Sequence, residues 1–289
     1  MKKLNKLFYF IAMVVFFTSC EDVIQVKLDK GNPLVTVDAF VNNMRSEQKI
    51  RLTYTNDYFA KTKNDPVIGA TVVVKDLTNG VSYNFTDKSN GDYVFTNNPT
   101  DTIARVNHNY ELTINFKGVN YTATSKVNRT SSVDSIDVVY KEAGAFGGEA
   151  GYKCAFLGFD PLGDDADYYW IKSYRNGDMF NKGQEINLAC DGAYSHAADG
   201  FPFIPPIAES ITPGGEFFQK FDVVRVEIHS ISEQTWNFLF QVQSQTTNSG
   251  LFATTPENIK SNVSSSDANV KVVGWFSMSA VGYREKIVQ

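Results

Sequence analysis

Cysteine and histidine are scarce in this sequence, with three of each among 289 residues. His108, His196 and His229 are scattered, and none belongs to a His-Glu-x-x-His motif. The chain also lacks a Gly-x-Ser-x-Gly nucleophile motif, paired cysteines for zinc and a glycine-rich phosphate loop before a helix. We therefore expect no enzyme, no metal and no cofactor. A cryptic hydrolase is the weakest alternative, because catalytic histidines can lie far from their partners in sequence.

One acidic segment, Asp160–Asp167, offers several carboxylates, which are ligands that calcium prefers. The segment lacks EF-hand spacing, and Asp and Gly are also the ordinary residues of turns between strands. We therefore expect a turn here and assign no metal ligand to it.

Long apolar runs are absent apart from Leu7–Phe17, which follows three lysines within the first six residues. This run is shorter than the roughly 20 residues that a membrane-spanning helix needs. A basic start, a short apolar run and small residues before Cys20 are typical of a lipoprotein export signal, although Phe17 stands where Leu is more usual. The sequence therefore predicts a signal peptide over residues 1–19 and a lipid on Cys20 that anchors the chain to a membrane. The alternative is a simple secretory peptide with a chance cysteine.

Positive charge is also in short supply. Removal of residues 1–19 takes away three lysines and leaves 24 Lys and Arg against 32 Asp and Glu, a net charge of −8. Such a chain does not favour nucleic acid, which proteins bind chiefly through clustered Lys and Arg. The remaining 270 residues are long enough for two domains with hydrophobic cores.

The chain does contain many short runs rich in Val, Ile, Thr, Tyr and Phe, separated by Asn, Gly, Asp and Pro. Such runs predict short strands, whose apolar face needs a second sheet to cover it. We therefore expect a mainly β protein with two β-sandwich-like domains, at residues 23–126 and 133–289, joined by a polar connector. The expected strands cover 34–41, 49–54, 70–76, 81–86, 93–95, 110–116, 121–124, 133–140, 151–159, 167–174 and 223–228.

One helix, at about residues 231–247, interrupts the strand pattern of the second domain. Ser230 and Glu233 have the spacing of a capping box, and Trp236, Leu239 and Phe240 then recur at helical spacing. Large apolar residues at this spacing are usually core, so we expect the helix to cover an open sheet face.

Two cysteines remain in the second predicted domain. Cys154 and Cys190 could form a disulfide in an oxidising compartment, or they could be two separate buried thiols. The sequence leaves both alternatives open.

Aromatic residues are abundant, at 13% of the chain. Trp170 follows Tyr168 and Tyr169 in a predicted strand, so Tyr169 points away from the other two rings. These rings fill the core of the second sandwich, or one set contacts a ligand or partner. The stretch 201–207 has three prolines, which favour a position at the edge of a sheet or outside it. We expect its apolar residues to fold back onto the domain or to form a partner surface; they are Phe201, Phe203, Ile204 and Ile207.

A resemblance to a known family is carried by residues 20–24, 33–41, 67–76, 133–137, 230–232, 251–259, 262–263 and 273–277. These segments resemble an uncharacterised family of Bacteroidota outer-membrane lipoproteins, of the type called domain of unknown function 4249, whose genes commonly lie beside TonB-dependent transporters. Residues 69–76 separately resemble the carboxypeptidase regulatory-type β-sandwich, an accessory fold without catalytic residues. None of these segments is a catalytic signature.

The resemblance implies a cell-surface lipoprotein of the outer membrane, accessory to a TonB-dependent transporter in nutrient capture, with a ligand that stays unknown. A structural or adhesin-like surface protein is the alternative. Glu21 and Asp22 match the acidic surface-export signal of the resembled bacteria. Thr102 and Ser135 lie in Asp-Thr-Ile and Asp-Ser-Ile, which are similar to the O-glycosylation acceptor of those bacteria.

Overall fold

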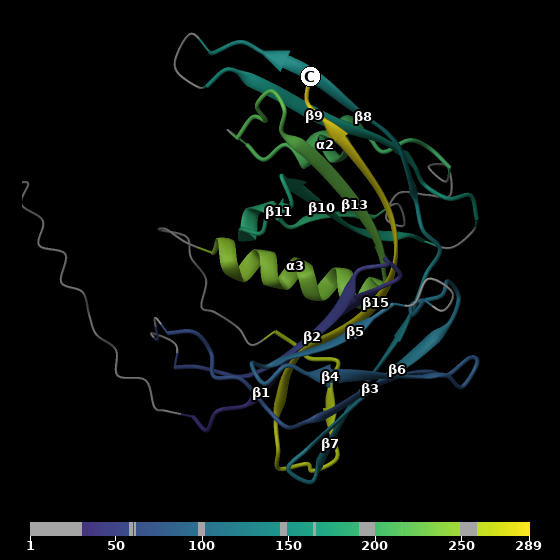
Figure 1. Ribbon diagram of the computed structural model, residues 1–289, viewed down its shortest axis with the longest axis vertical. Coiled ribbons are helices and arrows are strands. Elements are labelled where there is room, and N and C mark those ends of the chain that lie inside the picture. The colour runs from purple at the N-terminus through teal and green to yellow at the C-terminus, as the bar shows by residue number, and fades with distance from the viewer. Residues whose placement is uncertain are drawn as a thin grey trace, which may run out of the picture. The chain divides into compact units, whose positions relative to one another are not determined.

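A computed structural model describes residues 31–57, 60, 62–97, 102–144, 149–163, 166–190, 200–214, 216–248 and 259–289. Residues Pro33–Gln289 form one compact unit (Figure 1). Its strands are β1 Val35–Asn42, β2 Glu47–Tyr54, β3 Thr71–Asp76, β4 Ser82–Asp87, β5 Asp92–Thr96, β6 Asn109–Phe116, β7 Val119–Lys126, β8 Ser132–Lys141, β9 Gly151–Phe159, β10 Tyr168–Arg175, β11 Asp178–Met179, β12 Asn187–Cys190, β13 Val223–Ile231, β14 Ser264–Ser265 and β15 Val272–Ile287. The helices are α2 Pro205–Ala208 and α3 Glu233–Thr247, and the 3₁₀ turns are η1 Gly183–Glu185 and η3 Glu209–Ile211.

The mainly β prediction is confirmed, and each expected strand coincides with an observed one to within a few residues. Period-two alternation explains the agreement, because successive side chains of a strand point to opposite faces. In β1, for example, Val35, Val37, Ala39 and Val41 are buried, and the residues between them face the other way. Within the described residues, one hydrogen-bonded path of strands runs β11-β10-β13-β15-β1-β2-β5-β4-β3-β6-β7-β14, with β12 also pairing β10.

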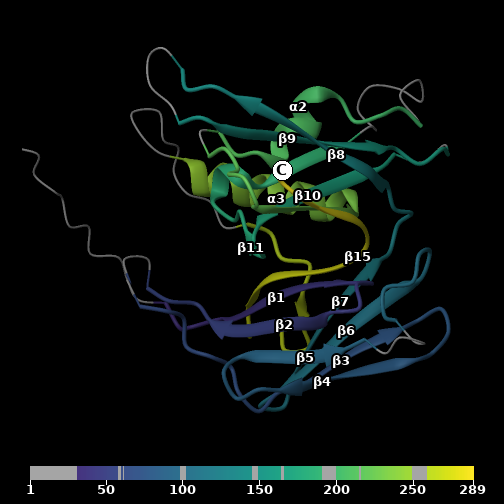
Figure 2. The same ribbon diagram turned by 45° about the horizontal axis from the view of Figure 1, so that its top comes forward.

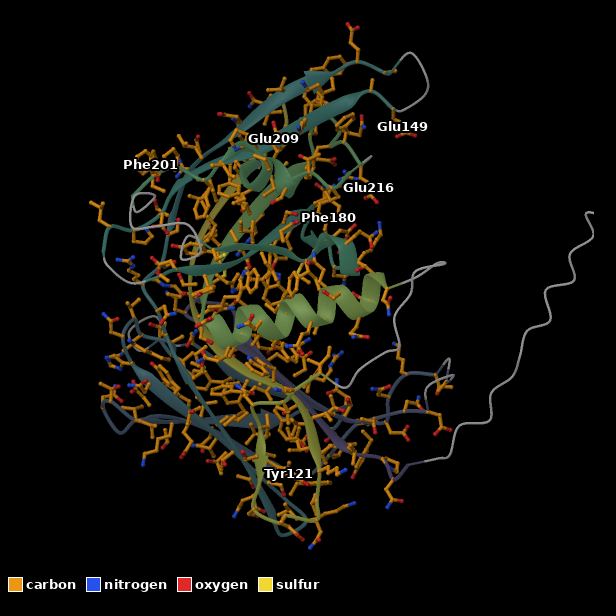
Figure 3. The ribbon with its side chains drawn as sticks, turned by 180° about the vertical axis from the view of Figure 1, so that it is seen from behind. Tyr121, Glu149, Phe180, Phe201, Glu209 and Glu216 are labelled. Carbon is orange, nitrogen blue, oxygen red and sulfur yellow. The ribbon has the colours of Figure 1, made fainter. Side chains whose placement is uncertain are left out.

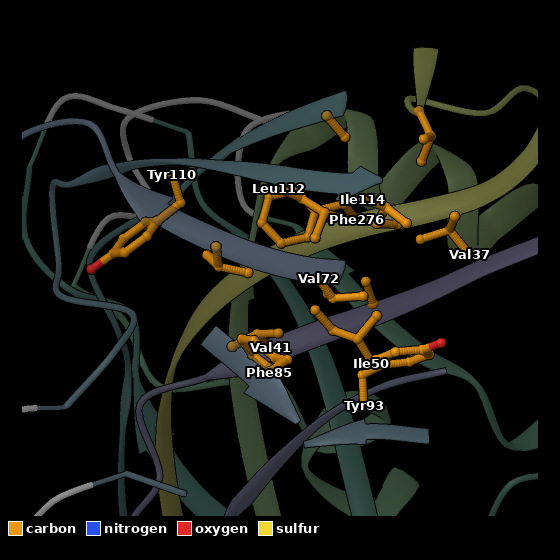
Figure 4. Close-up of a cluster of buried hydrophobic side chains, with 14 of the residues drawn as sticks. Val37, Val41, Ile50, Val72, Phe85, Tyr93, Tyr110, Leu112, Ile114 and Phe276 are labelled. Carbon is orange, nitrogen blue, oxygen red and sulfur yellow. The ribbon is translucent and has the colours of Figure 1, made fainter. Parts of the chain in front are cut away.

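The first hydrophobic cluster lies where this path folds over itself between β5 and β4. Those two strands share only the pairs Thr86–Val94 and Asp87–Tyr93, so the chain turns a corner between two sheets here. Buried side chains of β1 and β2 meet those of β3, β4 and β6 in one cluster, including Ile50, Phe85 and Leu112 (Figure 4). This arrangement is a β-sandwich, and it leaves the even-numbered side chains of β1 outside the core.

The second hydrophobic cluster joins the two-stranded sheet of β8 and β9 to one face of β10 and β13. Its buried members include Phe156 from β9, Ile171 from β10 and Ile228 from β13. Because these members lie on one face of β10 and β13, the opposite face of the two strands is free of this core.

Thr212, which follows η3, ties that segment to β9. Its hydroxyl accepts from the Cys154 amide and donates to the Cys154 carbonyl, each at 2.8 Å.

Strand β15 belongs to both halves of the unit. Val272–Ser279 pair in parallel with β1, and Ala280–Ile287 pair antiparallel with β13, so one continuous strand passes from the first cluster to the second (Figure 2). Phe276 and Met278 are buried in the first cluster, although they lie far beyond residue 126 in the chain. The division into domains at 23–126 and 133–289 stays a prediction, and it would separate β15 from its partner strand β1.

Helix α3 is present, but its N-cap lies two residues later than expected. Ser230 and Ile231 belong to β13, and the Ser232 hydroxyl accepts the Thr235 amide at 3.1 Å as the N-cap. The capping box at Ser230 and Glu233 is therefore wrong, because β13 pairs with β10 and β15 through Ser230. Of the expected core residues of the helix, Leu239 is buried, whereas Phe240 is 49% exposed. In the part of the chain that the structure describes, no helix has the length and apolar character for crossing a membrane.

Candidate functional site

The sheet face opposite the two clusters carries polar and aromatic side chains. Antiparallel partners share a face, so the register between β10, β13 and β15 places Trp170 beside His229 and Lys172 beside Glu227. The parallel pairing of β1 with β15 adds Asp38 beside Trp275. The residues of this face are Asp38, Phe40, Trp170, Lys172, Tyr174, Arg225, Glu227, His229, Trp275, Ser277, Ser279, Tyr283 and Glu285.

This face is strongly concave. The rings of Phe40 on β1 and Trp170 on β10 have centroids 5.3 Å apart and meet edge to face. Strands β13 and β15 lie between them in the sheet, and flat strands about 4.8 Å apart would hold the two positions about 14 Å apart. The sheet must therefore curl toward this face, which the small side chains Ser277 and Ser279 of β15 permit.

Helix α3 covers one end of the concave face. The Trp275 indole donates to the Thr235 hydroxyl at 3.0 Å, and that hydroxyl donates to Ser277 at 3.2 Å. The ring of Phe238 stacks on Trp275 with centroids 4.6 Å apart. The helix is thus fixed over β15, and its residues 238–242 become one wall of a hollow.

The hollow has a volume of about 310 Å³ and lies between β1, β10, α3 and residues 179–186. We call it the aromatic hollow, because five rings line it: Phe40, Trp170, Phe180, Phe238 and Trp275. Figure 3 shows Phe180 in the part of the chain that faces α3. Small-molecule sites are typically concave, mostly apolar and at least this large, with a few placed polar groups. The hollow meets this description.

Two unpaired charges of opposite sign lie in the wall of the aromatic hollow, whereas a third charged residue there, Glu185, is paired with Lys182 at 3.3 Å. Lys172 Nζ lies 3.9 Å from the centre of the Trp170 ring, a cation–π contact, and Asp38 lines the wall from β1. Neither group has a hydrogen bond or an ion pair within 4.0 Å among the described residues. Loss of hydration lowers the pKa of Lys172 to about 8, against the opposing charges of Glu227 and Asp38. Loss of hydration also raises the pKa of Asp38, although its side chain reaches solvent, and Arg51 and Lys172 oppose that rise.

A buried polar network adjoins Lys172. Glu227 accepts from the Tyr174 hydroxyl at 2.8 Å and pairs with Arg225 at 2.7 Å, and His229 Nε2 lies 3.0 Å from it. Burial would raise the pKa of Glu227, but the contacts with His229, Tyr174 and Arg225 outweigh burial and lower it to about 2. Burial, reinforced by the charge of Lys172, lowers the pKa of His229 to about 4. A carboxylate only accepts, so the neutral His229 carries its proton on Nε2.

A second hollow of about 290 Å³ lies over this network and shares Lys172 with the aromatic hollow. Its other lining groups, such as Arg225 and Glu285, are already paired at 3.0 Å. Lys172 thus lies at the junction of an apolar hollow and a polar one.

A larger hollow of about 630 Å³ lies beside β9 and η3. It is shallow, and Lys153 and Glu209 in its wall are paired at 2.6 Å. Glu149 and Glu209, both in this wall, are labelled in Figure 3. Because this hollow is shallow and Lys153 in its wall already has a counter-charge, it is a weaker candidate for a ligand site.

The structure separates the residues expected to contact a ligand or partner. Trp170 lies in the aromatic hollow, whereas the stretch 201–207 lies beside β9, where Phe159 and Pro202 form an isolated bridge. Phe203 folds back and its ring meets Tyr169 at 5.2 Å between centroids, while Phe201 is 61% exposed.

Ile207 likewise packs against the second cluster, whereas Ile204 is 59% exposed. The role of this stretch as a partner surface therefore stays a prediction for Phe201 and Ile204 alone.

The expected modification sites are only partly visible. Cys20, Glu21 and Asp22 lie outside the described residues. Thr102 lies between β5 and β6, and Ser135 lies in β8 beside a register shift; both are half-buried. Their lipidation, export and O-glycosylation stay predictions.

The two remaining cysteines are not bonded to each other. Cys154 is buried in β9, and Cys190 is half-buried at the end of β12, opposite Tyr168 of β10. The alternative of separate thiols therefore holds. Burial raises the pKa of the Cys154 thiol to about 12, which makes it a poor nucleophile.

The acidic segment serves the fold in its described part. Asp160 accepts from the Tyr169 hydroxyl at 2.5 Å, and Asp167 accepts from Arg129 Nε at 2.8 Å. Arg129 also donates to the Leu162 carbonyl at 2.6 Å and so ties the turn together. Among the described residues, no group of three or more His, Cys, Asp or Glu side chains could hold a metal.

Sequence reasoning missed most of the aromatic hollow. Of its members, Trp170 alone is predicted from the sequence as a possible contact residue. The sequence patterns place Phe40, Lys172 and Asp38 in strands and assign them no role in binding. Alternation did place Asp38 and Phe40 on the face of β1 away from the core, which was a usable signal. No signal in the sequence places that face against β10, because the two strands meet through β13 and β15.

With this geometry established, comparison with known families gives a clear result. A family model described as domain of unknown function, DUF4249, matches residues 21–285. The chain belongs to the DUF4249 family. Among curated proteins, no match was found.

Two solved structures show weak similarity. The FN1–FN3 domains of chicken CNTN1 are 13% identical, with a TM-score of 0.23, over 68% of this chain and 59% of that one. A Ca²⁺-stabilized adhesin that helps an Antarctic bacterium bind ice is 16% identical, with a TM-score of 0.20, over 69% of this chain and 45% of that one. The DUF4249 chain thus spans roughly half the length of each, and such scores support no functional argument.

Proposed function

We propose that this DUF4249 protein is a non-enzymatic binding protein, held by the lipid on Cys20 at the outer surface of the outer membrane, that captures a small nutrient for a TonB-dependent transporter. The lipid anchor and the transporter rest on the N-terminal sequence pattern and on the resemblance to lipoproteins encoded beside such transporters. The binding role rests on the structure. Its strongest support is the aromatic hollow, with Lys172 and Asp38 unpaired in its wall.

The unpaired Lys172 favours a binding role because a partly buried ammonium group without a counter-charge is costly, whereas Asp38 reaches solvent. A charge removed from water is ordinarily paired, as Glu227 is by Arg225 and Tyr174 on the same face. A fold that only presents β-sandwiches gains nothing from an unpaired ammonium group among aromatic rings. A ligand that reaches Lys172 would supply the missing partner.

The competing proposal is a structural or adhesin-like surface protein. The exposed apolar residues Leu162, at 81%, and Phe201, at 61%, favour a contact surface of this kind. Such a protein would use these residues and would not need the aromatic hollow.

The test is affinity purification from solubilised outer membranes of wild-type protein, Trp170→Ala and Phe201→Ser. We expect a transporter to co-purify stoichiometrically with wild type and Trp170→Ala, and a bound small molecule, detected by mass spectrometry, to be lost from Trp170→Ala alone. A wild-type preparation with neither transporter nor small molecule would overturn the proposal and favour the structural role.

The anchor is tested separately. Cys20→Ser should leave an unprocessed precursor, and protease treatment of intact cells should remove the wild-type protein from the surface. Normal processing of Cys20→Ser would contradict the lipoprotein assignment.

A further inference from the structure

The aromatic hollow restricts the chemistry of what it can hold, and this inference rests on the proposed binding function. Its walls are mainly apolar rings, so a ligand must bury an apolar body there. A sugar can stack its C–H face on one ring, but its outward hydroxyl groups would then meet the other rings that line the hollow, and each hydroxyl without a partner would cost free energy. The main body of the ligand is therefore an apolar side chain or ring.

The unpaired charges of the hollow are one cation, Lys172, and one anion, Asp38, because the carboxylate of Glu185 in the same wall is bonded to Lys182. On the surrounding face, Arg225 is bonded to Glu227 and Glu285, and Arg51 is bonded to Asp92 at 2.6 Å. Lys172 and Asp38, in contrast to these paired groups, have no bonded counter-charge among the described residues. They lie more than 4.0 Å apart, yet close enough for each to influence the pKa of the other.

Each charge has a defined position. Lys172 Nζ is held over the Trp170 ring, which leaves its remaining donors directed away from that ring. Asp38 lies on β1 with Arg51 as its cross-strand neighbour, but the Arg51 guanidinium is bonded to Asp92. The hollow thus presents one donor cation and one acceptor anion on a common apolar wall.

We propose that the aromatic hollow binds a small zwitterion with an apolar body, of which an α-amino acid with a large apolar side chain is the simplest. The ligand carboxylate pairs with Lys172, its ammonium group pairs with Asp38, and its side chain lies among Phe40, Phe238 and Trp275. Charge-assisted hydrogen bonds are the strong ones, so both pairs contribute to selection. The volume of about 310 Å³ suits one such molecule.

The experiment is isothermal titration calorimetry of the purified protein with four probes. L-Phenylalanine carries both charges, phenylalaninamide lacks the carboxylate, 3-phenylpropionate lacks the ammonium group, and glucose is the sugar control. We expect phenylalanine to bind, and each probe with one charge missing to bind at least about tenfold more weakly. The dipeptide Phe-Phe, added as a fifth probe, distinguishes a free amino acid from a peptide end.

Two variants assign the charges. Lys172→Met keeps a chain of similar length over Trp170, and it should abolish the preference for phenylalanine over phenylalaninamide. Asp38→Asn should abolish the preference for phenylalanine over 3-phenylpropionate. Lys220→Met is the matched control, since Lys220 also lies over an aromatic ring, that of Phe221 at 5.3 Å, but outside the hollow. Melting temperatures of all three variants confirm that they are folded.

The outcomes separate this inference from the function on which it rests. Equal affinity of wild type for phenylalanine and 3-phenylpropionate, or tighter binding of glucose, would overturn the zwitterion. Should no probe bind while Trp170→Ala still loses the small molecule that co-purifies with wild type, the zwitterion is wrong and the binding function stands. If no probe binds and Trp170→Ala keeps the same co-purified small molecules as wild type, both the zwitterion and the binding function are wrong.

Discussion

Lys172 and Trp170 lie two residues apart on one face of β10, with the ammonium nitrogen 3.9 Å from the ring centre. The alternation of a strand alone brings them to the same face, and the ring then offers its electron-rich surface to a cation that has no carboxylate bonded to it among the described residues. This contact makes β10 the strand that links the aromatic hollow to the polar network around Glu227.

The stability of the protein should depend on the pH through Lys172. Its pKa of about 8 lies below its ordinary value of 10.5, so between these values the unfolded chain binds a proton that the folded chain does not. The contribution of Lys172 to the free energy of unfolding therefore rises as the pH increases from about 8 to 10.5. Glu227 and Asp38, which face Lys172, stay ionised there, and His229 stays neutral. The stability advantage of Lys172→Met over wild type in urea should shrink from pH 8 to 10; a constant difference would contradict this.

Glu227→Gln should destabilise the fold by about 3 kcal/mol, because it leaves Arg225 and its neighbours without a buried counter-charge. Glu285→Gln is the control, since Glu285 bonds the same arginine from a side chain that is 50% exposed, and it should cost less than about 1 kcal/mol. Urea unfolding at pH 7 measures both. Equal effects would show that burial of Glu227 has no special role.

Ser232→Ala should destabilise the protein by about 1 kcal/mol, because the hydroxyl caps α3 through the Thr235 amide. Ser230→Ala should be neutral or slightly stabilising, since the buried Ser230 hydroxyl has no hydrogen-bond partner in the described part of the chain. Thermal unfolding of the two variants distinguishes the observed cap from the one that the sequence suggested. A larger loss from Ser230→Ala would contradict the observed cap.

Gly274→Ala should be among the most disruptive small substitutions in the first half of β15. Gly274 has φ +109°, and an added Cβ would lie 1.9 Å from the Val37 carbonyl oxygen, so β1 and β15 would have to separate. Gly80→Ala, at φ +81° with open space, should cost only about 1–2 kcal/mol of left-handed strain. The soluble yield and the urea midpoint of the two variants are compared. Equal midpoints would show that β15 can move away from β1 without loss of stability.

Phe203→Ser should lower stability by about 2 kcal/mol or more, because its ring packs against Phe156 and Tyr169. Phe201→Ser should change stability by less than about 0.5 kcal/mol and should weaken partner binding if the exposed ring is a contact. Unfolding midpoints together with co-purification test the pair. Unchanged partner recovery with Phe201→Ser would remove Phe201 from the proposed surface.

The sequence by itself determined most of the strands, the presence of the helix and the face that strands such as β1 turn inward. In β1 the alternation of Val and Ala with polar residues was enough to separate core from surface, because strand periodicity is a local property. It missed β15, whose run of buried Trp275, Phe276, Ser277 and Met278 does not alternate in burial. Both faces of that stretch are covered, one by the first cluster and the other by α3, so its pattern does not show a simple strand.

Only the tertiary structure decided where the candidate site lies. Phe40 and Trp170 are 130 positions apart in the sequence, and their contact depends on the order of strands and on the curl of the sheet between them. The same pairing sets Asp38 and Lys172 on one wall without bonding them. Strand order and sheet curvature arise from the packing of distant segments, and local sequence patterns carry no record of them.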